Sequence, residues 1–515
     1  MVRTPFIALR LRGLTLMALA PLLALAGCGS DPAHAFDRPA SEPEARNAIL
    51  FVGDGMGIAT VTATRVLSVG VGGDLVLDRM PFTALSRTAT TDYITPDSAG
   101  TMTAMITGVN TNNGVISMAP STERSDFNED GDGAPLTTLV ELAKAAGMRV
   151  GIVTTARVTH ATPAAAYGHI NERTRELELA LQTLPTDATY NAALEGGLDL
   201  LMGGGRRSFL PREELDEEGT PGRRRDGRDL RAEFQAAGYH YIWDGTGFEA
   251  LEPTDLPALA LFSASHMAYE YDRALDPGRE PSLAEMTAKA IELLSAGDER
   301  YLLIVESGRI DHAHHEGNAF RSLLDTEQFD VALGTALHAV DLAETLVVAT
   351  ADHSHAFVLG GYNLRPETEL PYTVSDAPAT YTGAPSGGEI LNTVHSLSTS
   401  RGGIVEARDA NGLPYPGLTY GNGPGYRDDR IDPREDVFLG HSGVAPAGPQ
   451  DPNYLQEAAV PRADETHAGE EVALYAIGPG AQRLRGTVRN TFTFELMRSA
   501  LKLPLGTGAA PGGPR

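Results

Sequence analysis

Short apolar runs alternate with stretches of helical periodicity along most of the chain. Rich in Val, Ile and Leu, the runs predict buried strands; they are residues 48–52, 150–154, 198–202, 301–305, 346–350 and 472–476. Helical spacing of apolar residues predicts helices at 138–146, 282–294 and 492–501. Because such alternation is typical of parallel sheets, we expect an α/β fold, a three-layer sandwich with a mostly parallel central sheet flanked by helices.

The composition of the chain changes between residues 365 and 459, where Gly, Pro, Ser and Asp are frequent and apolar periodicity weakens. We interpret 365–459 as an inserted subdomain that divides the α/β core into 47–364 and 460–505. Residues 506–515 are Gly, Pro and Ala-rich, which predicts a disordered tail.

The N-terminus has the pattern of an export signal. Arg3, Arg10 and Arg12 precede an apolar run at 14–26, which is shorter than the roughly 20 residues that a membrane span needs. The run leads into Leu-Ala-Gly-Cys, which resembles a bacterial lipobox, so Cys28 is the predicted lipidation site. We expect a signal peptide at 1–27, a lipidated flexible tether at 28–46, and a location in the periplasm or on the cell surface. The alternative is an ordinary signal peptide with a chance cysteine.

The net charge of −27 argues against nucleic-acid binding, which depends on Lys and Arg. A phosphate ester is still an acceptable substrate, because metal ions reverse the local sign of the charge in a pocket. Cys28 is the only cysteine, so the chain has no internal disulfide.

Three predicted strands lead into residues that commonly bind metals: Asp54, Glu306, and Asp352 with His353. In open α/β sheets the carboxyl ends of the strands meet at the ligand-binding crevice. A single acid after a strand is usually just solvated, but three together predict a metal site. The glycines at 53–57 do not form G-x-G-x-x-G, and Asp54 among them would repel a pyrophosphate. Dinucleotide binding is therefore not expected.

A second candidate group lies in the His-rich stretch after Glu306. Asp311 and His315 are four residues apart, so on a helix they share one face and can hold one ion. Zn²⁺ suits this mixture of ligands, and His467 is a possible further ligand. The alternative is a solvated histidine-rich loop.

Ser98 lies in Thr-Pro-Asp-Ser-Ala-Gly-Thr, just before a stretch that can be helical. At a helix N-terminus, free N–H groups and the helix dipole would favour a serine alkoxide and an incoming phosphate. The alternative is that Asp97 or Ser98 merely caps the helix. The G-x-S-x-G motif of α/β-hydrolases is absent from the sequence.

Six ordered motifs together resemble those of alkaline phosphatases, especially the animal-type enzymes, from about Asn47 to Leu503. They are residues 52–57, 96–100, 160–163, 305–315, 350–355 and 465–469, and residues 420–426 resemble part of the crown insertion of that group. We therefore expect 365–459 to form a crown-like subdomain.

The resemblance implies hydrolysis of phosphate monoesters through a phosphoserine on Ser98, with two Zn²⁺ ions and one Mg²⁺ ion. It assigns the ligands of one zinc to Asp311, His315 and His467, those of the second to Asp54, Asp352 and His353, and those of magnesium to Asp54, Thr162 and Glu306. It also implies that Arg173 grips the phosphoryl oxygens, that His160 lies beside the magnesium, and that His312 and His355 lie near the zinc ions.

The animal-type enzymes often bind Ca²⁺ as well, and Glu233, the Phe262 carbonyl and Asp276 align with its ligands. Ser263 stands where a glutamate is expected, so we expect calcium to bind weakly. The resemblance further implies a homodimer that acts on small phosphomonoesters and touches a membrane only through the lipid. The alternatives are a phosphodiesterase of the same superfamily and a non-catalytic metal- or phosphate-binding lipoprotein.

Overall fold

The computed structural model describes residues 44–126, 133–361, 416–426 and 452–504, and the backbone alone of 395–398 and 403–406. The predicted signal peptide, Cys28 with the tether as far as residue 43, and the predicted tail lie outside the described residues.

The described residues form a ten-stranded central sheet. Across the sheet the strands are β16 (Thr487–Val488), β2 (Phe82–Ser86), β15 (Val472–Ile477), β8 (Thr345–Ala351), β1 (Asn47–Gly53), β7 (Tyr301–Ser307), β3 (Arg149–Arg157), β4 (Leu200–Gly204), β6 (Ala258–Leu261) and β5 (His240–Ile242). Every neighbouring pair is parallel except those of β15, which is antiparallel to β8 and to β2. The predicted mostly parallel sheet is thus confirmed.

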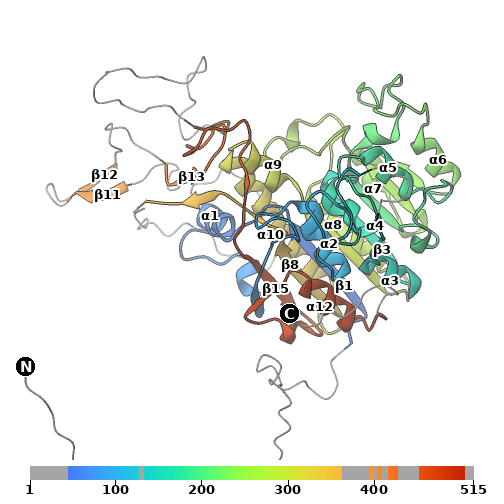
Figure 1. The fold of residues 1–515 in the computed structure, drawn as a ribbon, viewed down its shortest axis with the longest axis horizontal. Coiled ribbons are helices and arrows are strands. Elements are labelled where there is room, and N and C mark those ends of the chain that lie inside the picture. The colour runs from blue at the N-terminus through green and yellow to red at the C-terminus, as the bar shows by residue number, and fades with distance from the viewer. Residues whose placement is uncertain are drawn as a thin grey trace, which may run out of the picture. The chain divides into compact units, whose positions relative to one another are not determined.

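Both faces of the sheet are covered by helices (Figure 1). Residues of β1 alternate between two apolar clusters, with Leu50 and Val52 in one and Ile49 and Phe51 in the other. The first cluster contains residues of α2 (Ser98–Thr107), α3 (Leu139–Ala145), α4 (Ala161–Tyr167), α5 (Glu176–Gln182), α6 (Leu230–Ala236) and α12 (Phe492–Ala500). The second contains residues of α7 (Gly245–Ala250), α8 (Leu283–Leu294) and α10 (Ala319–Ala339). The molecule is therefore the three-layer α/β sandwich that the pattern predicts.

Helix ends follow local sequence signals. Thr138 caps α3 and Ser282 caps α8, each through a capping box with the glutamate three residues later. The 21-residue α10 was not among the predicted helices. Its buried face carries Asp325 and Asp330 among apolar residues, which interrupts the apolar periodicity.

Part of the predicted insertion packs on the core. β13 (Leu418–Tyr420) pairs with β10 (Phe357–Leu359), and its Leu418 and Tyr420 share a cluster with residues of α1 (Ile58–Val69) and α10. β11 (His395–Ser398) pairs with β12 (Gly403–Glu406) in a separate two-stranded sheet. The rest of 365–451 lies outside the described residues, so the boundaries and the crown-like form of the insertion stay predictions.

The remaining elements are short. They are α9 (Arg309–His315), β9 (Ser354–His355), β14 (His467–Ala468), and the 3₁₀ turns Leu77–Arg79, Ala192–Leu194, Arg206–Phe209, Pro253–Asp255, Arg273–Leu275 and Ala481–Arg483.

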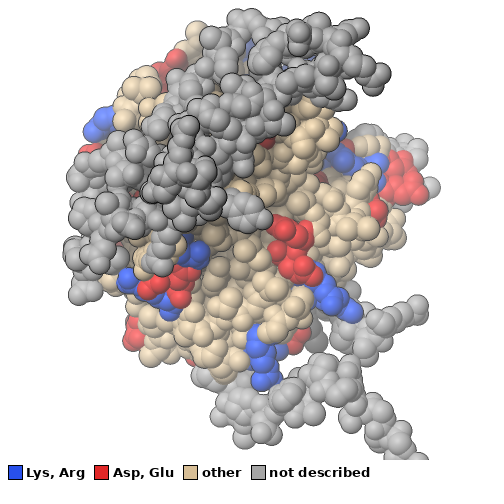
Figure 2. All heavy atoms as spheres, turned by 90° about the vertical axis from the view of Figure 1, so that its left-hand side faces the viewer, with Lys and Arg blue, Asp and Glu red and all other residues tan. Residues whose placement is uncertain are grey.

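In the part of the chain that the structure describes, we find no helix with the length and apolar character needed to cross a membrane. Figure 2 shows basic and acidic side chains in small mixed groups over the described surface of one face. This charge pattern differs from the continuous basic surface that nucleic-acid binding favours.

Candidate active site

The candidate site lies where three adjacent central strands end. β1 runs between β7 and β8, with Gly53 opposite both Ser307 and Ala351. Asp54, which follows Gly53, therefore lies beside Glu306 and the Asp352–His353 pair, as parallel strands require. All four side chains are almost completely buried.

Several groups of His, Asp and Glu side chains near these strand ends have potential ligand atoms within 4.8 Å of one another. The groups are Asp311 with His353, His355 and His467; His315 with His355 and Glu465; Asp54 with His160 and Glu306; and Asp54 with Asp352 and His353.

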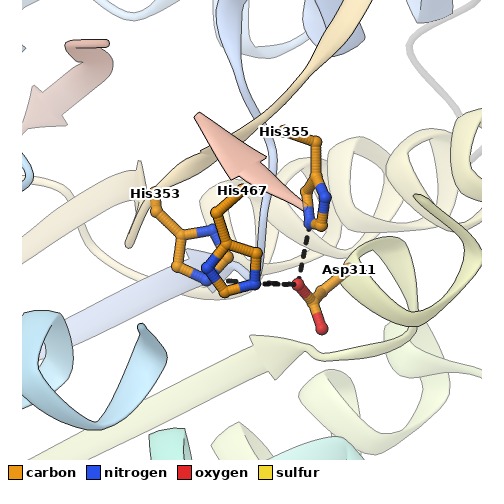
Figure 3. A group of neighbouring side chains, drawn as sticks. All are labelled: Asp311, His353, His355 and His467. Atoms are coloured by element: carbon orange, nitrogen blue, oxygen red, sulfur yellow. Dashed lines mark hydrogen bonds and ion pairs between the residues drawn. The ribbon is translucent and has the colours of Figure 1, made fainter. Parts of the chain in front are cut away.

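Asp311, His315 and His467 converge from two distant parts of the chain. α9 places Asp311 and His315 on one face, and His467 comes from β14. The Asp311 Oδ1 lies 3.3 Å from the Nε2 of each histidine, and the two Nε2 atoms lie 3.0 Å apart. Figure 3 shows His467 and His353 stacked side by side with nitrogens facing Asp311; their ring centroids are 3.6 Å apart.

The outer nitrogens of these histidines set their tautomers. His467 Nδ1 donates to the Pro96 carbonyl and His315 Nδ1 donates to the Glu465 carbonyl, both at 2.7 Å. A neutral imidazole that donates from Nδ1 presents a lone pair at Nε2. Two lone pairs and a carboxylate oxygen then face one another, an arrangement that a metal cation stabilises.

A second group surrounds Ser98. His353 Nε2 lies 3.3 Å from Asp54 Oδ1 and 3.4 Å from Asp352 Oδ2. The Ser98 Oγ lies 3.2 Å from His353 Nε2 and 3.4 Å from Asp54 Oδ1. The other Asp352 oxygen accepts the backbone N–H of Gly55 at 3.0 Å, which fixes the carboxylate.

Ser98 is the first residue of α2, and Asp97 is its N-cap, accepting the Gly100 N–H at 3.1 Å. Asp97, not Ser98, is therefore the capping residue. The other Asp97 oxygen accepts Arg173 Nη1 at 2.9 Å, and Arg173 Nη2 lies 3.2 Å from His160 Nε2. Burial would raise the pKa of Asp97, but the charge and hydrogen bond of Arg173 hold that pKa below its ordinary value.

The third group contains mostly oxygen atoms. Asp54 Oδ2 accepts the Thr162 hydroxyl at 3.4 Å, so the two Asp54 oxygens face different groups. Glu306 Oε2 accepts the Thr154 hydroxyl, but Glu306 Oε1 is buried and has no hydrogen-bond partner among the described residues. A buried carboxylate oxygen without a partner is costly unless a cation or water satisfies it.

Crowding of these carboxylates perturbs their acidity. Burial raises the pKa of Asp54 and of Glu306 well above the ordinary values, and the negative charges nearby add to the effect. Burial likewise raises the pKa of Asp352 to about 7. These carboxylates would be stabilised in their charged form by bound cations.

The three further histidines named in the sequence lie around these groups. His355 Nε2 is 2.7 Å from Asp311 Oδ1. His312 Nδ1 is 3.1 Å from Arg309 Nη1, and its ring centroid lies 5.3 Å from that of His160. His266, which the sequence analysis missed, packs against both rings, with its centroid 3.9 Å from that of His312 and 5.3 Å from that of His160.

The sequence analysis also assigned no role to Thr154 or Glu465, and it considered Asp97 only as a possible helix cap. Asp97 and Glu465 stand inside the quoted motifs, directly beside Ser98 and two residues before His467. Their positions next to Ser98 and His467 were the feature of the sequence that could have identified them. Thr154 and His266 lie outside those motifs, and only the fold brings them to the site.

One of the residues aligned with a calcium site, Glu233, is paired with an arginine. Both Glu233 oxygens bind Arg228, at 2.9 and 2.6 Å. Glu218 and Asp276 both lie beside Gly278, with an oxygen of each 3.2 Å from the position that a Cβ on that glycine would take. Within the described ranges, the potential metal-binding groups include neither Glu233 nor Asp276.

Comparisons with known proteins agree with this geometry. The alkaline phosphatase family model matches residues 45–503. The chain is 36% identical over 483 residues to an alkaline phosphatase of Gadus morhua, covering 89% of this chain and 92% of that protein. It is also 36% identical over 482 residues to the tissue-nonspecific isozyme of Homo sapiens, covering 88% of this chain and 83% of the isozyme.

Solved structures support the fold. The Thermus thermophilus alkaline phosphatase superposes with a TM-score of 0.62 at 27% identity, covering 90% of this chain and 92% of that chain. The alkaline phosphatase of the Antarctic bacterium TAB5 superposes with a TM-score of 0.59 at 20% identity, covering 90% of this chain and 100% of that chain.

The family match spans nearly all of the described core, and the relatives exceed a third identity over most of their own length. The buried groups of potential metal ligands at the strand ends agree with the metal dependence of that family. The chain therefore belongs to the alkaline phosphatase family and is a phosphatase, a hydrolase of phosphate esters.

Proposed function

We propose that the protein hydrolyses phosphate monoesters to an alcohol and inorganic phosphate through a phosphoserine on Ser98, at a site that holds two Zn²⁺ ions and one Mg²⁺ ion. The observation that carries this proposal is the environment of Ser98. Its Oγ lies at the N-terminus of α2, 3.2 Å from His353 Nε2 and 3.4 Å from Asp54 Oδ1. A nucleophile in that environment is activated by cations and by the helix dipole.

The donor atoms fit two zinc ions. Tetrahedral zinc with bonds of 2.0–2.1 Å brings its ligand atoms to about 3.3 Å from one another. The separations within Asp311, His315 and His467 are 3.0 to 3.3 Å. His353 is 3.3 and 3.4 Å from the oxygens of Asp54 and Asp352. These two sets would each hold one zinc ion.

The third group fits magnesium, which prefers oxygen ligands. Asp54, Thr162 and Glu306 would hold it, and the unpartnered Glu306 Oε1 supports a cation at this position. His160 would lie beside that ion, since its ligand atom lies within 4.8 Å of those of Asp54 and Glu306.

When bound, the metal ions would neutralise charge on the reacting oxygens and lower the pKa of the oxygens that they hold. Ser98 Oγ attacks phosphorus, the Oγ–P bond forms, and the bond from phosphorus to the leaving oxygen breaks. The serine proton passes to solvent, and the leaving oxygen takes up a proton from solvent and is released as the alcohol. Water then attacks the phosphoserine, regenerating Ser98 and releasing inorganic phosphate.

Two side chains prepare the phosphoryl group. Arg173 would bind two phosphoryl oxygens with its guanidinium fork. Asp97 orients Arg173 through the 2.9 Å ion pair while it also caps the helix that begins with Ser98. Because recognition centres on the phosphoryl group, we expect broad specificity among phosphomonoesters.

The test is hydrolysis of p-nitrophenyl phosphate and of its bis-ester by residues 29–515 between pH 6 and 11. Each assay is run as purified, after chelation, and after restoring Zn²⁺ and Mg²⁺. Alkaline monoester turnover that disappears with the chelator and returns with metal is the expected result. Faster turnover of the bis-ester would show a phosphodiesterase. Inactivity of folded, metal-loaded protein on both esters would contradict the proposal.

We further propose export with a lipid on Cys28, and a homodimer. Labelled palmitate should be incorporated by the full chain and not by Cys28→Ala. Sedimentation of the exported protein should give the mass of two chains. Soluble, unlabelled protein or a monomer would contradict the respective proposal.

A further inference from the structure

Glu465 is a buried carboxylate between α9 and the strand pair β9–β14, with only 1% of its surface exposed. Both of its side-chain oxygens have partners. Oε2 bonds to His355 Nδ1, and Oε1 accepts the Ala356 backbone N–H at 2.7 Å. Glu465 lies in a group of potential metal ligands with His315 and His355, and each of its oxygens is held by one of these two hydrogen bonds.

The bond to His355 continues to the metal ligands. His355 Nε2 lies 2.7 Å from Asp311 Oδ1, the same oxygen that faces His315 and His467. His355 thus lies between two carboxylates, and its orientation determines where the Asp311 oxygen is held. Partners of this kind fix the direction of a metal ligand.

The backbone of Glu465 reaches the same group. Its carbonyl accepts His315 Nδ1 at 2.7 Å, and its N–H donates to the His315 carbonyl at 2.9 Å. His467 follows two residues later and is paired with His355 between β14 and β9. All three predicted ligands of the first zinc are therefore connected to Glu465.

We propose that Glu465 is a positioning residue for the zinc ion held by Asp311, His315 and His467, and that it acts through His355. The inference rests on the proposed function, because it needs a zinc ion at that position. Glu465 has no described contact with Asp54, Asp352 or His353. Its effect should therefore be confined to one of the two zinc ions.

Contacts between rings do not by themselves determine the orientation of the His355 ring. The ring of His314 lies 4.8 Å from that of His355 and is held by Tyr420, Thr60 and Ser322. These contacts support one side of the His355 ring. The direction of its two nitrogens depends on the hydrogen bonds to Glu465 and Asp311.

The test is zinc binding, measured without substrate by competition with a chelator in the exported full-length protein. Wild type should bind two zinc ions tightly. Glu465→Ala should weaken one of them by about 10- to 100-fold, the range found when partners of metal ligands are removed, and leave the other unchanged. Glu465→Gln should fall between, because its single amide oxygen can still accept one of the two hydrogen bonds that the carboxylate accepts. Asp464→Asn, an exposed neighbour with the same charge, is the matched control and should bind like wild type.

The melting temperature of each metal-free variant separates positioning from loss of fold. If Glu465→Ala does not fold, Glu465→Gln carries the test, with one zinc ion bound about 3- to 10-fold more weakly than in wild type. Two unchanged zinc sites in both variants, or equal weakening of both sites, would overturn the inference. Wild type that binds no zinc would instead contradict the proposed function, and this inference with it.

Discussion

Individual carboxylates at this site contact two different groups, one with each oxygen. Asp54 directs Oδ1 toward Ser98 and His353 and Oδ2 toward Thr162. Asp97 likewise caps α2 with one oxygen and pairs with Arg173 through the other. Because each carboxylate has two oxygens, replacing one residue disturbs two parts of the site.

Ser98→Ala should abolish the phosphoserine and lower kcat by about 10³-fold or more, as loss of a nucleophile does in other enzymes. The measurement is acid-quenched incorporation of labelled phosphate together with steady-state rates. Zinc content should stay at the wild-type level, because the predicted ligands are intact. Labelled phosphate on the variant protein would show that another residue is the nucleophile.

Asp97→Asn separates the two roles of Asp97. Asn caps helices about as well as Asp, so the cap is kept. Its amide NH2 cannot accept the Gly114 N–H and Arg173 Nη1 that Asp97 Oδ2 accepts at 2.9 Å, so stability should fall by about 1–3 kcal/mol. Arg173 loses its ion pair, so the inhibition constant of inorganic phosphate should rise by about 3- to 10-fold, a change of about 1 kcal/mol. Competitive inhibition assays and urea unfolding measure the two effects. An unchanged inhibition constant would show that Arg173 is held by other contacts.

At the scale of elements, short segments are held by their neighbours. α9 has only seven residues, too few for a stable isolated helix. Its start is tied to β3, because the N–H groups of Gly308 and Arg309 donate to Thr155 Oγ1 at 3.0 and 3.3 Å. The spacing of Asp311 and His315 thus becomes useful only after α9 has docked on the sheet.

His169 connects α3 to the segment after α4. Its Nε2 bonds to Glu141 at 2.7 Å and its Nδ1 to the Ser117 carbonyl at 2.8 Å. Burial lowers the pKa of His169, but the hydrogen bond and charge of Glu141 raise it more, so the net shift is upward. A raised histidine pKa stabilises the fold fully below the unfolded value of about 6.5, and this stability is lost as pH rises through the folded pKa.

His169→Gln should therefore destabilise the metal-free protein more at pH 6 than at pH 9. Urea unfolding of both proteins across that range measures the difference, and because both proteins keep the same metal ligands, the titration of those ligands cancels in the comparison. His240→Gln, at an exposed histidine 3.8 Å from Asp255, is the control for a surface histidine and should destabilise the protein less than His169→Gln. A pH-independent effect of His169→Gln would contradict the ion pair with Glu141.

At the scale of the whole molecule, the apolar core borders a buried group of acidic side chains. Two clusters of buried apolar residues lie on opposite faces of the sheet. At the carboxyl ends of its central strands lie three buried acidic residues, Asp54, Glu306 and Asp352. Burial, and after it the neighbouring negative charges, raise the pKa values of these carboxylates, so their charged forms are destabilised in the metal-free fold. Bound cations should then contribute to the stability of the entire core.

Removal of the three proposed ions should lower the melting temperature by about 8 °C, since each ion present at 100 times its Kd adds about 2.7 kcal/mol and a core of this size shifts by about 1 °C per kcal/mol. Calorimetry before and after chelation, and after restoring Zn²⁺ and Mg²⁺, is the measurement. The Ser98→Ala variant should show the same drop, because it keeps every predicted ligand. A melting temperature unaffected by chelation would mean that the buried group of acidic side chains is stable without cations.

The local sequence pattern by itself determined the central strands and several residues of the site. The apolar runs at 48–52, 301–305 and 346–350 correspond to β1, β7 and β8, and the ligand-type residues at their ends follow from parallel pairing. The position of Ser98 at the start of a helix could also be predicted from the sequence. So could the shared face of Asp311 and His315, because the relation between residues i and i+4 is set within one helix.

Tertiary structure decided the rest. His467 meets Asp311 only because β14 pairs with β9, and Asp97 meets Arg173 only because α2 and the segment after α4 dock on the same face. Glu465, His266 and Thr154 gain partners in the same way. Periodicity reflects forces between residues near in sequence, whereas contacts between distant residues depend on strand order and packing, which no short segment encodes alone.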